Sequence, residues 1–196
     1  VNVLFSAPTA FRAIRKEDPD GKWAKKYDLK HLRTIFMAGE RCDSSTLEWT
    51  QKVTGKPVID HWWQTETGWS IAANPIGLDP MEVKAGSPTK AMPGYNLKVL
   101  DADGKECKAG KLGNLVIKLP LPPSCLMGIW NDDVRYQKSY LDFYKGYYLT
   151  GDSGYIDKDG YVWVMGRMDG VINVAGHRLS TGEMEEVVGK HPDVAE

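Results

Sequence analysis

A chain of 196 residues is long enough for one large domain or for one and a half small ones. With 42% hydrophobic and 26% charged residues, its composition is that of an ordinary globular protein. The formal net charge of −1 argues against nucleic acid or an anionic membrane as the main partner, because such partners attract a broadly basic surface.

The first third of the chain predicts strands and helices in alternation. Residues 1–16 predict a buried strand, a turn at 7–9 and a helix, and residues 28–39 predict a short polar helical segment followed by a strand. A helix is expected over 44–55, and a short buried strand over 57–63. Ser44 or Ser45 can cap the third of these helices, and Gly55 can end it. This alternation is typical of an α/β layer.

After Gly77 the sequence changes to short strands with turn residues between them. Three hairpins are expected, and the residues at their turns are Asp103 with Gly104, Asp159 with Gly160, and Ala175 with Gly176. A last helix over 182–191 can be capped by Ser180 or Thr181, with Glu183 as a capping-box partner of Ser180. The prolines of 119–124 predict a rigid connector.

The cysteines and the two ends of the chain carry further information. Cys42, Cys107 and Cys125 stand far apart without a CxxC pair, which argues against a zinc site or a disulfide framework and fits a reducing compartment. No apolar run approaches the length of a membrane span, and the N-terminus lacks the order of a signal peptide. The chain opens on a strand-like alternation without an initiator Met and closes where another strand is expected, so we expect an internal piece of a longer protein.

Two short stretches carry candidate ligands for a nucleotide. In "DHWWQTETGWS" (60–70), the oxygens of Thr65 and Glu66 are expected at the carboxyl edge of a sheet, where they could hold Mg²⁺, although a plain polar strand cap explains them equally well. In "YLTGDSG" (148–154), Asp152 could accept the hydroxyls of a ribose, although aspartate also favours turns for local reasons and that explanation is the simpler one for this stretch alone.

The stretch "GRMDGVINVAGHRLSTGEMEE" (166–186) combines several weak signals in a fixed order. Arg167 and Arg178 stand eleven residues apart, with Asp169 between the expected hairpins. Planar guanidinium groups suit ribose and phosphate oxygens. The ordered set is a stronger signal than any one of its members.

These motifs together resemble the adenylate-forming acyl-CoA synthetase superfamily across nearly the whole chain. The residues that carry the resemblance are "AGE" (38–40), "DHWWQTETG" (60–68), "LTGD" (149–152) and the stretch over 166–186. Within the superfamily, "WWQTETGW", "LPLPPS", "IWNDD" and "INVAGHRLSTGEMEE" resemble the short-chain acetyl- and propionyl-CoA synthetases, above all the propionate-preferring mitochondrial enzymes of animals.

The resemblance implies an α/β fold and a division of the chain into two parts. Residues 1–168 would be the C-terminal part of the large AMP-binding domain, an α/β layer plus β-rich hairpins, and residues 169–196 the hinge and the start of the small C-terminal domain. The implied reaction is the ATP-dependent, AMP-forming ligation of a short-chain acid to coenzyme A through an acyl-adenylate. The phosphate loop and the C-terminal lysine of the family are not among these residues, so we expect the isolated piece to be inactive.

The resemblance also implies roles for single residues on the nucleotide side. The adenine would lie between two segments, made of Gly39, Glu40 and Arg41 on one side and of Asp60, His61, Trp62, Trp63, Gln64 and Thr65 on the other. The family often has proline where this chain has Arg41, which leaves the stiffness of that loop open. Asp152 would bind the ribose with help from Arg167.

The remaining roles concern phosphate, metal, hinge and coenzyme A. Thr65 and Glu66 would engage the α-phosphate and Mg²⁺, and Arg178 would face the polyphosphate as a third catalytic residue. Asp169 would be the hinge between two domain orientations. Ala175 and Gly176 would help form the channel for the pantetheine arm of coenzyme A.

For the acid substrate, the resemblance points to Trp63 and Ala38. Trp63 would close the far end of the acyl pocket, because a longer chain would collide with the ring. Acetyl-specific relatives have valine where this chain has Ala38, so we expect propionate to be preferred and acetate or butyrate to be tolerated. The alternative is that Ala38 reflects packing alone.

The expected partners are therefore ATP or AMP, Mg²⁺, coenzyme A and a small carboxylate, without nucleic acid and without a membrane span. By resemblance the compartment would be the mitochondrial matrix, with the cytoplasm as the alternative. Two other functions stay open: an adenylating enzyme for another acid, against which Trp63 argues, and a nucleotide-binding module without catalysis.

Overall fold

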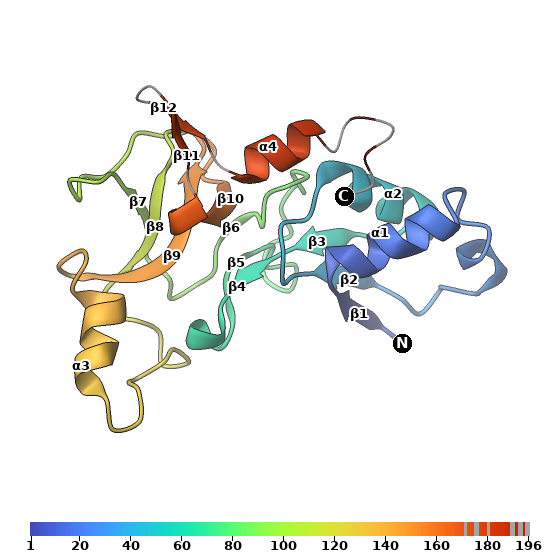
Figure 1. Cartoon of the computed structure of the whole chain (residues 1–196). Coiled ribbons are helices and arrows are strands. Elements are labelled where there is room, and N and C mark those ends of the chain that lie inside the picture. Colours follow the sequence, from blue (N-terminus) through green and yellow to red (C-terminus); the bar gives the residue numbers. More distant parts are fainter. Residues whose placement is uncertain (171, 175–176, 180, 189–190, 192–193, 195–196) are drawn as a thin grey trace.

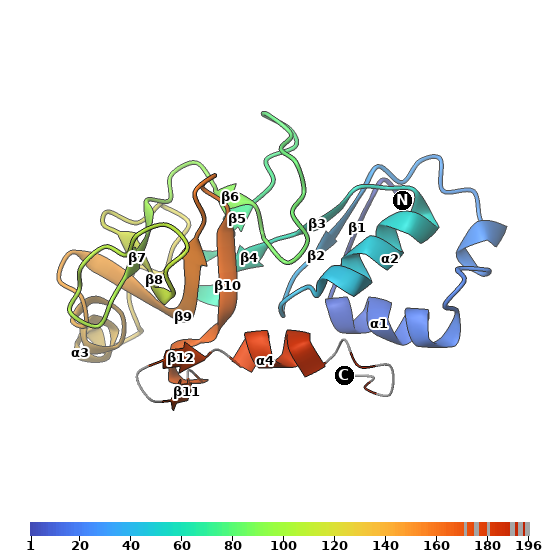
Figure 2. The same ribbon diagram turned by 90° about the horizontal axis from the view of Figure 1, so that it is seen from above.

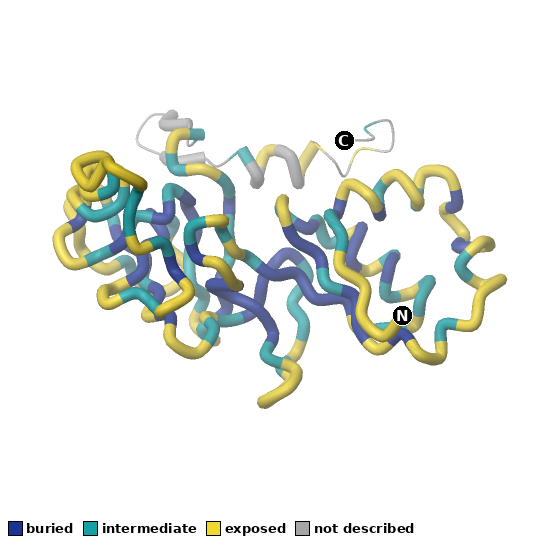
Figure 3. Tube along the Cα trace, turned by 90° about the horizontal axis from the view of Figure 1, so that it is seen from below, coloured by how far each residue is buried: buried dark blue, intermediate teal, exposed yellow. Residues whose placement is uncertain are grey.

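A computed structural model of the chain describes residues 1–170, 172–174, 177–179, 181–188, 191 and 194. Figure 1 shows an α/β part at the N-terminal end and a β-rich part formed by the later strands. The buried stretches of the chain continue from one part into the other (Figure 3), so the two parts share an interior. None of the described helices has the length and apolar character needed to cross a membrane.

The α/β part is a parallel sheet of three strands in the order β1-β2-β3. Its elements are β1 (Val3–Ser6), α1 (Pro8–Glu17), β2 (Thr34–Met37), α2 (Ser44–Thr54) and β3 (Val58–Asp60), with a short 3-10 turn at Ala24–Lys26. Both helices cover the same face of the sheet (Figure 2). The core between them includes Phe11, Ile35, Met37, Leu47 and Val58.

The local signals for α1 and α2 explain where these helices begin and end. Pro8 occupies the first helical position of α1, where its missing N–H leaves no bond unmade. The N-cap of α2 is Asp43, whose carboxylate accepts from Thr46 N at 2.8 Å, so the expected caps Ser44 and Ser45 are instead the first helical residues. Gly55 ends α2 in the left-handed conformation at φ +64°, as predicted.

Two expectations for the first third are wrong. Residues 28–33 are irregular, with a turn at 30–31, rather than helical, because the Asp28 carboxylate accepts the Lys30 N–H at 2.9 Å and starts a local turn. Strand β1 is an exposed edge strand, with Val3 45%, Leu4 39% and Phe5 56% exposed, since it pairs on one side only.

The stretch predicted as one strand over 57–63 is divided between two sheets. Strand β3 ends at Asp60, and β4 (Trp62–Trp63) pairs antiparallel with β5 (Ser70–Ala73) in a separate sheet of order β4-β5-β6. Only His61 lies between β3 and β4. The chain therefore passes from the parallel sheet to the β-rich part in a single residue.

The β-rich part contains a four-stranded antiparallel sheet of order β10-β9-β8-β7. The strands of this sheet are β7 (Leu97–Leu100), β8 (Gly113–Lys118), β9 (Tyr147–Ile156) and β10 (Val162–Arg167). The shorter elements around it are β6 (Lys90–Ala91), α3 (Asp133–Tyr136) and a π-helical turn (Gln137–Leu141). Ile71, Leu115, Ile117, Tyr148 and Val162 form its core. The hairpin predicted at Asp159 and Gly160 is confirmed, because β9 and β10 pair across that turn.

The C-terminal elements follow a 3-10 turn at Met168–Gly170. Strands β11 (Ile172–Val174) and β12 (His177–Leu179) pair antiparallel, as expected from the sequence for the third hairpin. Helix α4 (Thr181–Val188) lies beside β10 (Figures 1 and 2). The expected turn at Ala175 and Gly176 and the cap Ser180 lie outside the described residues, as does the Glu183 side chain. The division of the chain at residue 169 stays a prediction.

Candidate functional site

A pocket of about 300 Å³ lies where the parallel sheet meets the β-rich part. Three segments that are far apart in the sequence line it: residues 39–41 after β2, residues 60–64 between the two sheets, and Asp152 with Arg167 from β9 and β10. The structure therefore brings together ten of the residues that the sequence assigned to a nucleotide. Their individual roles stay predictions.

Asp152 is the polar centre of this pocket and is only 8% exposed. Its Oδ2 accepts hydrogen bonds from Trp62 Nε1 at 3.0 Å and Gln64 Nε2 at 2.6 Å. Burial raises the pKa of the Asp152 carboxyl, and the nearby charge of Arg167 and these hydrogen bonds oppose that rise. The donors fix the orientation of the carboxylate inside the pocket.

Arg167 reaches Asp152 from the neighbouring strand. The two residues are cross-strand partners in the register of β9 and β10, and Arg167 Nη1 donates to Asp152 Oδ1 at 3.2 Å. The Arg167 side chain is 62% exposed, so water screens much of this attraction. Gly151, at φ +74°, makes room for it, because a Cβ there would lie 2.5 Å from Arg167 Nη2.

Gln64 is fixed by contacts at both ends of its amide. Its Nε2 also donates to the Thr150 carbonyl at 2.7 Å, and its Oε1 accepts from Tyr148 Oη at 3.4 Å. Tyr148 is 1% exposed, so this contact ties Gln64 to the core of the β-rich part. The amide therefore presents a fixed donor to Asp152.

Two buried titratable side chains line the pocket at the end of β3. Burial raises the pKa of Asp60 to about 7, although backbone hydrogen bonds from Cys42 and His61 and the charge of Arg41 lower it. Burial lowers the pKa of His61, whose ring packs edge-on against Phe5 and Phe36 at 5.4 and 5.7 Å. Asp60 therefore keeps its proton to a higher pH than an ordinary aspartate does.

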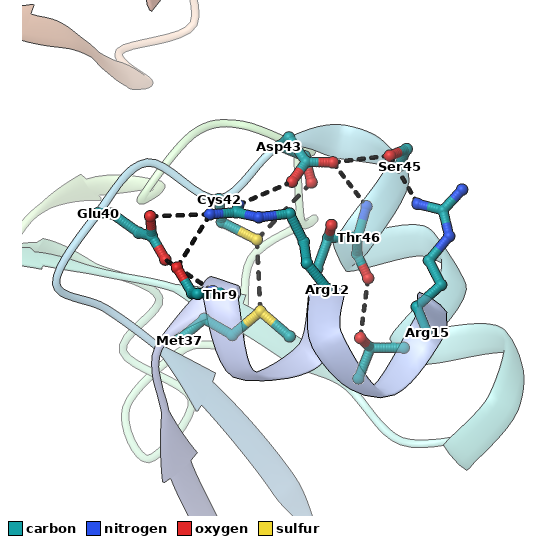
Figure 4. Close-up of polar contacts among 10 residues, drawn as sticks. Thr9, Arg12, Arg15, Met37, Glu40, Cys42, Asp43, Ser45 and Thr46 are labelled. Carbon is teal, nitrogen blue, oxygen red and sulfur yellow. Dashed lines mark hydrogen bonds and ion pairs between the residues drawn. The ribbon is translucent and has the colours of Figure 1, made fainter. Parts of the chain in front are cut away.

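The loop over residues 39–41 is attached to helix α1. The Glu40 carboxylate accepts from Thr9 N at 2.6 Å, from Thr9 Oγ1 and from Arg12 Nη2 at 2.8 Å (Figure 4). Burial would raise the pKa of Glu40, but the hydrogen bonds from Thr9 and Arg12 together lower it. Glu40 therefore stays ionised beside the pocket.

Thr65 and Glu66 lie just beyond the pocket, in a 3-10 turn (Thr65–Thr67), and are not among its lining residues. Glu66 Oε1 accepts from Tyr140 Oη at 3.0 Å, and the Tyr140 ring stacks on Tyr148 at 5.4 Å and 5°. Within the described chain, no group of three or more His, Cys, Asp or Glu side chains could enclose a metal ion. A hydroxyl and a carboxylate fit Mg²⁺ that keeps water and phosphate oxygens as its other ligands.

The residues assigned to the acid differ in their positions. Trp63 is 41% exposed and lines the same pocket as Asp152. Ala38 is buried, at 4% exposure, and does not line the pocket. Their roles in acid selection stay predictions.

Four of the assigned residues lie in or next to the less completely described C-terminal segment. Asp169 is exposed in the turn after β10. Arg178 pairs with Asn173 through the β11–β12 register, and its side chain lies outside the described part. Ala175 and Gly176 also lie outside it.

Sequence reasoning missed four lining residues, namely Gly86, Pro88, Val164 and Gly166. Gly86 has φ +84°, and a Cβ there would lie 3.5 Å from the Trp163 ring and 3.7 Å from Arg41 Nη2. The run "AGSPTK" (85–90) carries a turn signal in Gly86 and Pro88 that could have marked this segment. Val164 has no such signal.

The fold is thus that of an α/β protein with a pocket centred on a buried carboxylate, at the edge of a parallel sheet. The model of the family described as AMP-binding enzyme matches residues 1–130. The chain belongs to the AMP-binding enzyme family, which confirms the resemblance inferred from the motifs.

Individual relatives agree with this assignment. An uncharacterised protein of Pseudomonas aeruginosa is 58% identical over 196 residues, which cover 100% of this chain and 31% of that protein. The mitochondrial acyl-CoA synthetase short-chain family member 3 of Mus musculus is 50% identical, over 100% of this chain and 29% of that protein. The propionate–CoA ligase of Escherichia coli is 46% identical, over 100% of this chain and 31% of that protein.

A solved structure shares the fold. The crystal structure of an anthranilate CoA ligase in complex with anthranoyl-AMP matches with a TM-score of 0.83 and 28% identity, over 100% of this chain and 35% of that chain. This confirms the expected α/β fold as part of an adenylate-forming enzyme. The chain thus spans about a third of the length of the proteins it matches.

Proposed function

We propose that the chain is part of an enzyme that joins a short-chain carboxylic acid to coenzyme A, with ATP converted to AMP and pyrophosphate. The observation that carries the proposal is the buried carboxylate of Asp152, held by Trp62, Gln64 and Arg167 inside one pocket. A carboxylate offers about four acceptor positions, and side chains of the described residues occupy three of them, which leaves one for a ribose hydroxyl. The relatives named as CoA ligases support the reaction class.

The reaction needs positioned charge rather than a nucleophile from the protein. The acid attacks the α-phosphorus of ATP, pyrophosphate leaves, and an acyl-adenylate forms. The thiol of coenzyme A then attacks the acyl carbon, and AMP leaves. Since negative charge gathers on the phosphate oxygens in the first step, cationic groups fixed beside them lower the barrier.

The residues of the site divide this work between them. Asp152 would hold the ribose, with Arg167 beside it, and residues 39–41 and 60–64 would enclose the base. Thr65, Glu66 and Arg178 would face the phosphates, where bound Mg²⁺ supplies positive charge. Ala175 and Gly176 would line the path of coenzyme A, and Asp169 would be the hinge between residues 1–168 and 169–196.

The preferred acid is proposed to be propionate. Trp63 lines the pocket that holds Asp152. Its ring would form a bulky wall near the expected α-phosphate. Ala38 leaves more room than valine would, by an amount that suits about one extra carbon. The names of several relatives include the word mitochondrial, so the proposed compartment is the mitochondrial matrix, with the cytoplasm as the alternative.

A nucleotide-binding module without catalysis is the second candidate. The chain spans about a third of its relatives, and the motifs of the phosphate loop and of the C-terminal lysine are not among its residues. Such a module would bind AMP and ATP and would never form acyl-AMP. Turnover by a longer polypeptide that contains this chain separates the two functions.

Calorimetry with AMP tests the nucleotide site directly. The unsubstituted chain is expected to bind AMP, and Asp152→Asn to weaken binding at least ~10-fold, because a charged acceptor for the ribose is lost. Asp159→Asn is the matched control, since Asp159 lies at the far end of the same hairpin and pairs with Lys84. Absence of AMP binding by the unsubstituted chain would contradict the proposal.

A panel of acids then tests the reaction. A longer polypeptide that contains this chain is expected to release AMP and form acyl-CoA fastest with propionate, and the isolated chain is expected to form no acyl-AMP. A faster reaction with an aryl or long-chain acid would contradict the short-chain assignment.

A further inference from the structure

We infer that Arg12 of helix α1 is a positioning residue for the nucleotide pocket, because it holds both ends of the segment 40–43 that leads from the pocket-lining loop into α2. The inference rests on the proposed function, since it assigns Arg12 to the adenine side of the same pocket. Arg12 does not line the pocket itself, so its effect on a ligand would pass through Glu40.

The first contact ties the loop to the start of α1. Arg12 Nη2 donates to Glu40 Oε2 at 2.8 Å and to Thr9 Oγ1 at 3.0 Å, while Thr9 N donates to Glu40 Oε1 at 2.6 Å. The N–H groups of the first helical turn have no partner within the helix, and the helix dipole favours a negative charge there. Glu40 thus binds the N-terminal end of α1 from outside the helix.

The second contact ties the same guanidinium to the start of α2. Arg12 Nη1 donates to Asp43 Oδ2 at 3.3 Å. The other oxygen of Asp43 accepts from Thr46 N at 2.8 Å and from Ser45 Oγ at 2.7 Å, which caps α2. The Arg12 side chain is 21% exposed, so one half-buried cation connects the pocket loop with both helices (Figure 4).

In this arrangement the Glu40 carboxylate binds to helix α1 and does not point into the pocket as a free charge. Figure 4 shows the Glu40 carboxylate directed at Thr9 and Arg12. Without the guanidinium, an ionised carboxylate would remain on a loop that lines the pocket, with a weaker tie to the protein. A nucleotide would then meet a less ordered loop, and ordering that loop on binding would cost affinity.

Arg15 provides a matched control on the same helix. It lies one turn further along α1, is also half-buried, and donates from Nη1 to Ser45 Oγ at 2.8 Å. Arg15→Gln therefore loses an arginine tie between α1 and α2 but leaves the contacts of Glu40 in place. A difference between the two arginine variants reports on the loop and not on helix packing.

The experiment combines AMP calorimetry with thermal unfolding of the unsubstituted chain and the variants Arg12→Gln, Arg15→Gln, Arg12→Lys and Glu40→Gln. Both glutamine substitutions of arginine are expected to lower Tm by similar amounts. Of these two, only Arg12→Gln is expected to weaken AMP binding, by ~10-fold. Arg12→Lys is expected to weaken it less, because lysine keeps the positive charge but cannot donate from two nitrogens to two carboxylates.

Glu40→Gln tests the same inference if the Arg12 variants do not fold. It keeps the Arg12–Asp43 contact and removes the charge from the loop, and it is expected to weaken AMP binding by ~3-fold, as loss of one charge-assisted tie predicts. Equal AMP affinity in Arg12→Gln and Arg15→Gln, or no change in Glu40→Gln, would overturn this inference alone. No AMP binding by the unsubstituted chain would overturn the proposed function and this inference with it.

Discussion

The indole Nε1 of Trp62 donates a hydrogen bond to Oδ2 of Asp152 at 3.0 Å, although the two residues lie ninety positions apart in the chain. Trp62 belongs to the strand that follows the parallel sheet, and Asp152 to an inner strand of the four-stranded sheet. This single bond therefore joins two sheets at the centre of the pocket.

Trp62→Phe keeps an aromatic ring and removes this donor. AMP affinity is expected to fall ~5-fold, because the carboxylate loses one of the groups that orient it. Trp163→Phe is the control, since Trp163 Nε1 donates to Asp157 Oδ2 at 3.2 Å outside the pocket. Calorimetry and urea unfolding of both variants check the prediction, and equal AMP affinities would contradict it.

Gly151→Ala tests the space that Arg167 occupies. Alanine at φ +74° is expected to destabilise the fold by about 1–2 kcal/mol, as in any left-handed position. Its Cβ would also displace the flexible guanidinium of Arg167, so AMP binding is expected to weaken as well. Gly110→Ala carries the same strain at φ +79° with no atom within 4 Å, so it should lower Tm and leave AMP affinity intact.

The raised pKa of Asp60 predicts that the stability of the fold depends on pH. Its pKa is raised from 3.8 to about 7, so the folded state keeps a proton that the unfolded state has released in this range. This contribution to the free energy of unfolding is complete below pH 3.8 and is lost as pH rises through about 7. Asp60→Asn is expected to remove a slope of up to about 1.4 kcal/mol per pH unit in that window.

Urea unfolding at several pH values measures this slope in both proteins. Subtracting the two curves cancels the contribution of His61, whose pKa burial lowers and which acts in the opposite direction. Parallel curves for Asp60→Asn and the unsubstituted chain would show that Asp60 titrates at its ordinary pKa.

Tyr140→Phe tests the role proposed for Glu66. The phenylalanine keeps the stacking on Tyr148 and removes the hydroxyl that donates to Glu66 at 3.0 Å. The Mg²⁺ concentration needed for half-maximal ATP binding is expected to rise ~5-fold, because the carboxylate is less well oriented. Tyr136→Phe, which loses a hydrogen bond to the Leu126 carbonyl at 3.1 Å, should leave this concentration unchanged.

Ala38→Val tests the proposed choice of acid. The larger side chain is expected to lower the ratio of kcat/KM for propionate to that for acetate by ~10-fold or more, as one methylene typically allows. The measurement needs a polypeptide complete enough for turnover. An unchanged ratio would mean that Ala38, which is 4% exposed, serves packing alone.

Signals that act within a few residues predicted much of the fold. The run Thr34–Met37, the helix stop at Gly55 and the turn at Asp159 and Gly160 depend on local conformational preferences. The cap of α2 was misplaced by one or two positions, because aspartate and serine are equally good caps and the choice depends on which oxygen reaches the Thr46 N–H.

Contacts between distant residues could not be read from the sequence. The apolar run over 57–63 is continuous, and its division at His61 follows from pairing with Ser70–Ala73, which periodicity does not report. The motifs placed ten of the lining residues together and missed four others. Arg12 lies outside every motif, and its contact with Glu40 spans 28 positions, so only the fold reveals it.

Because only one residue separates β3 from β4, the parallel sheet and the sheet of β4, β5 and β6 are joined without a flexible linker. A rotation of one sheet against the other cannot be taken up by a linker, so it must distort the backbone at His61 and shift Asp60 relative to Trp62, both of which line the pocket. Side chains alternate between faces along a strand, and a deletion of His61 would therefore turn both tryptophans of the pair to the opposite face. The length of this junction is thus fixed by the strand pairing on both sides of it.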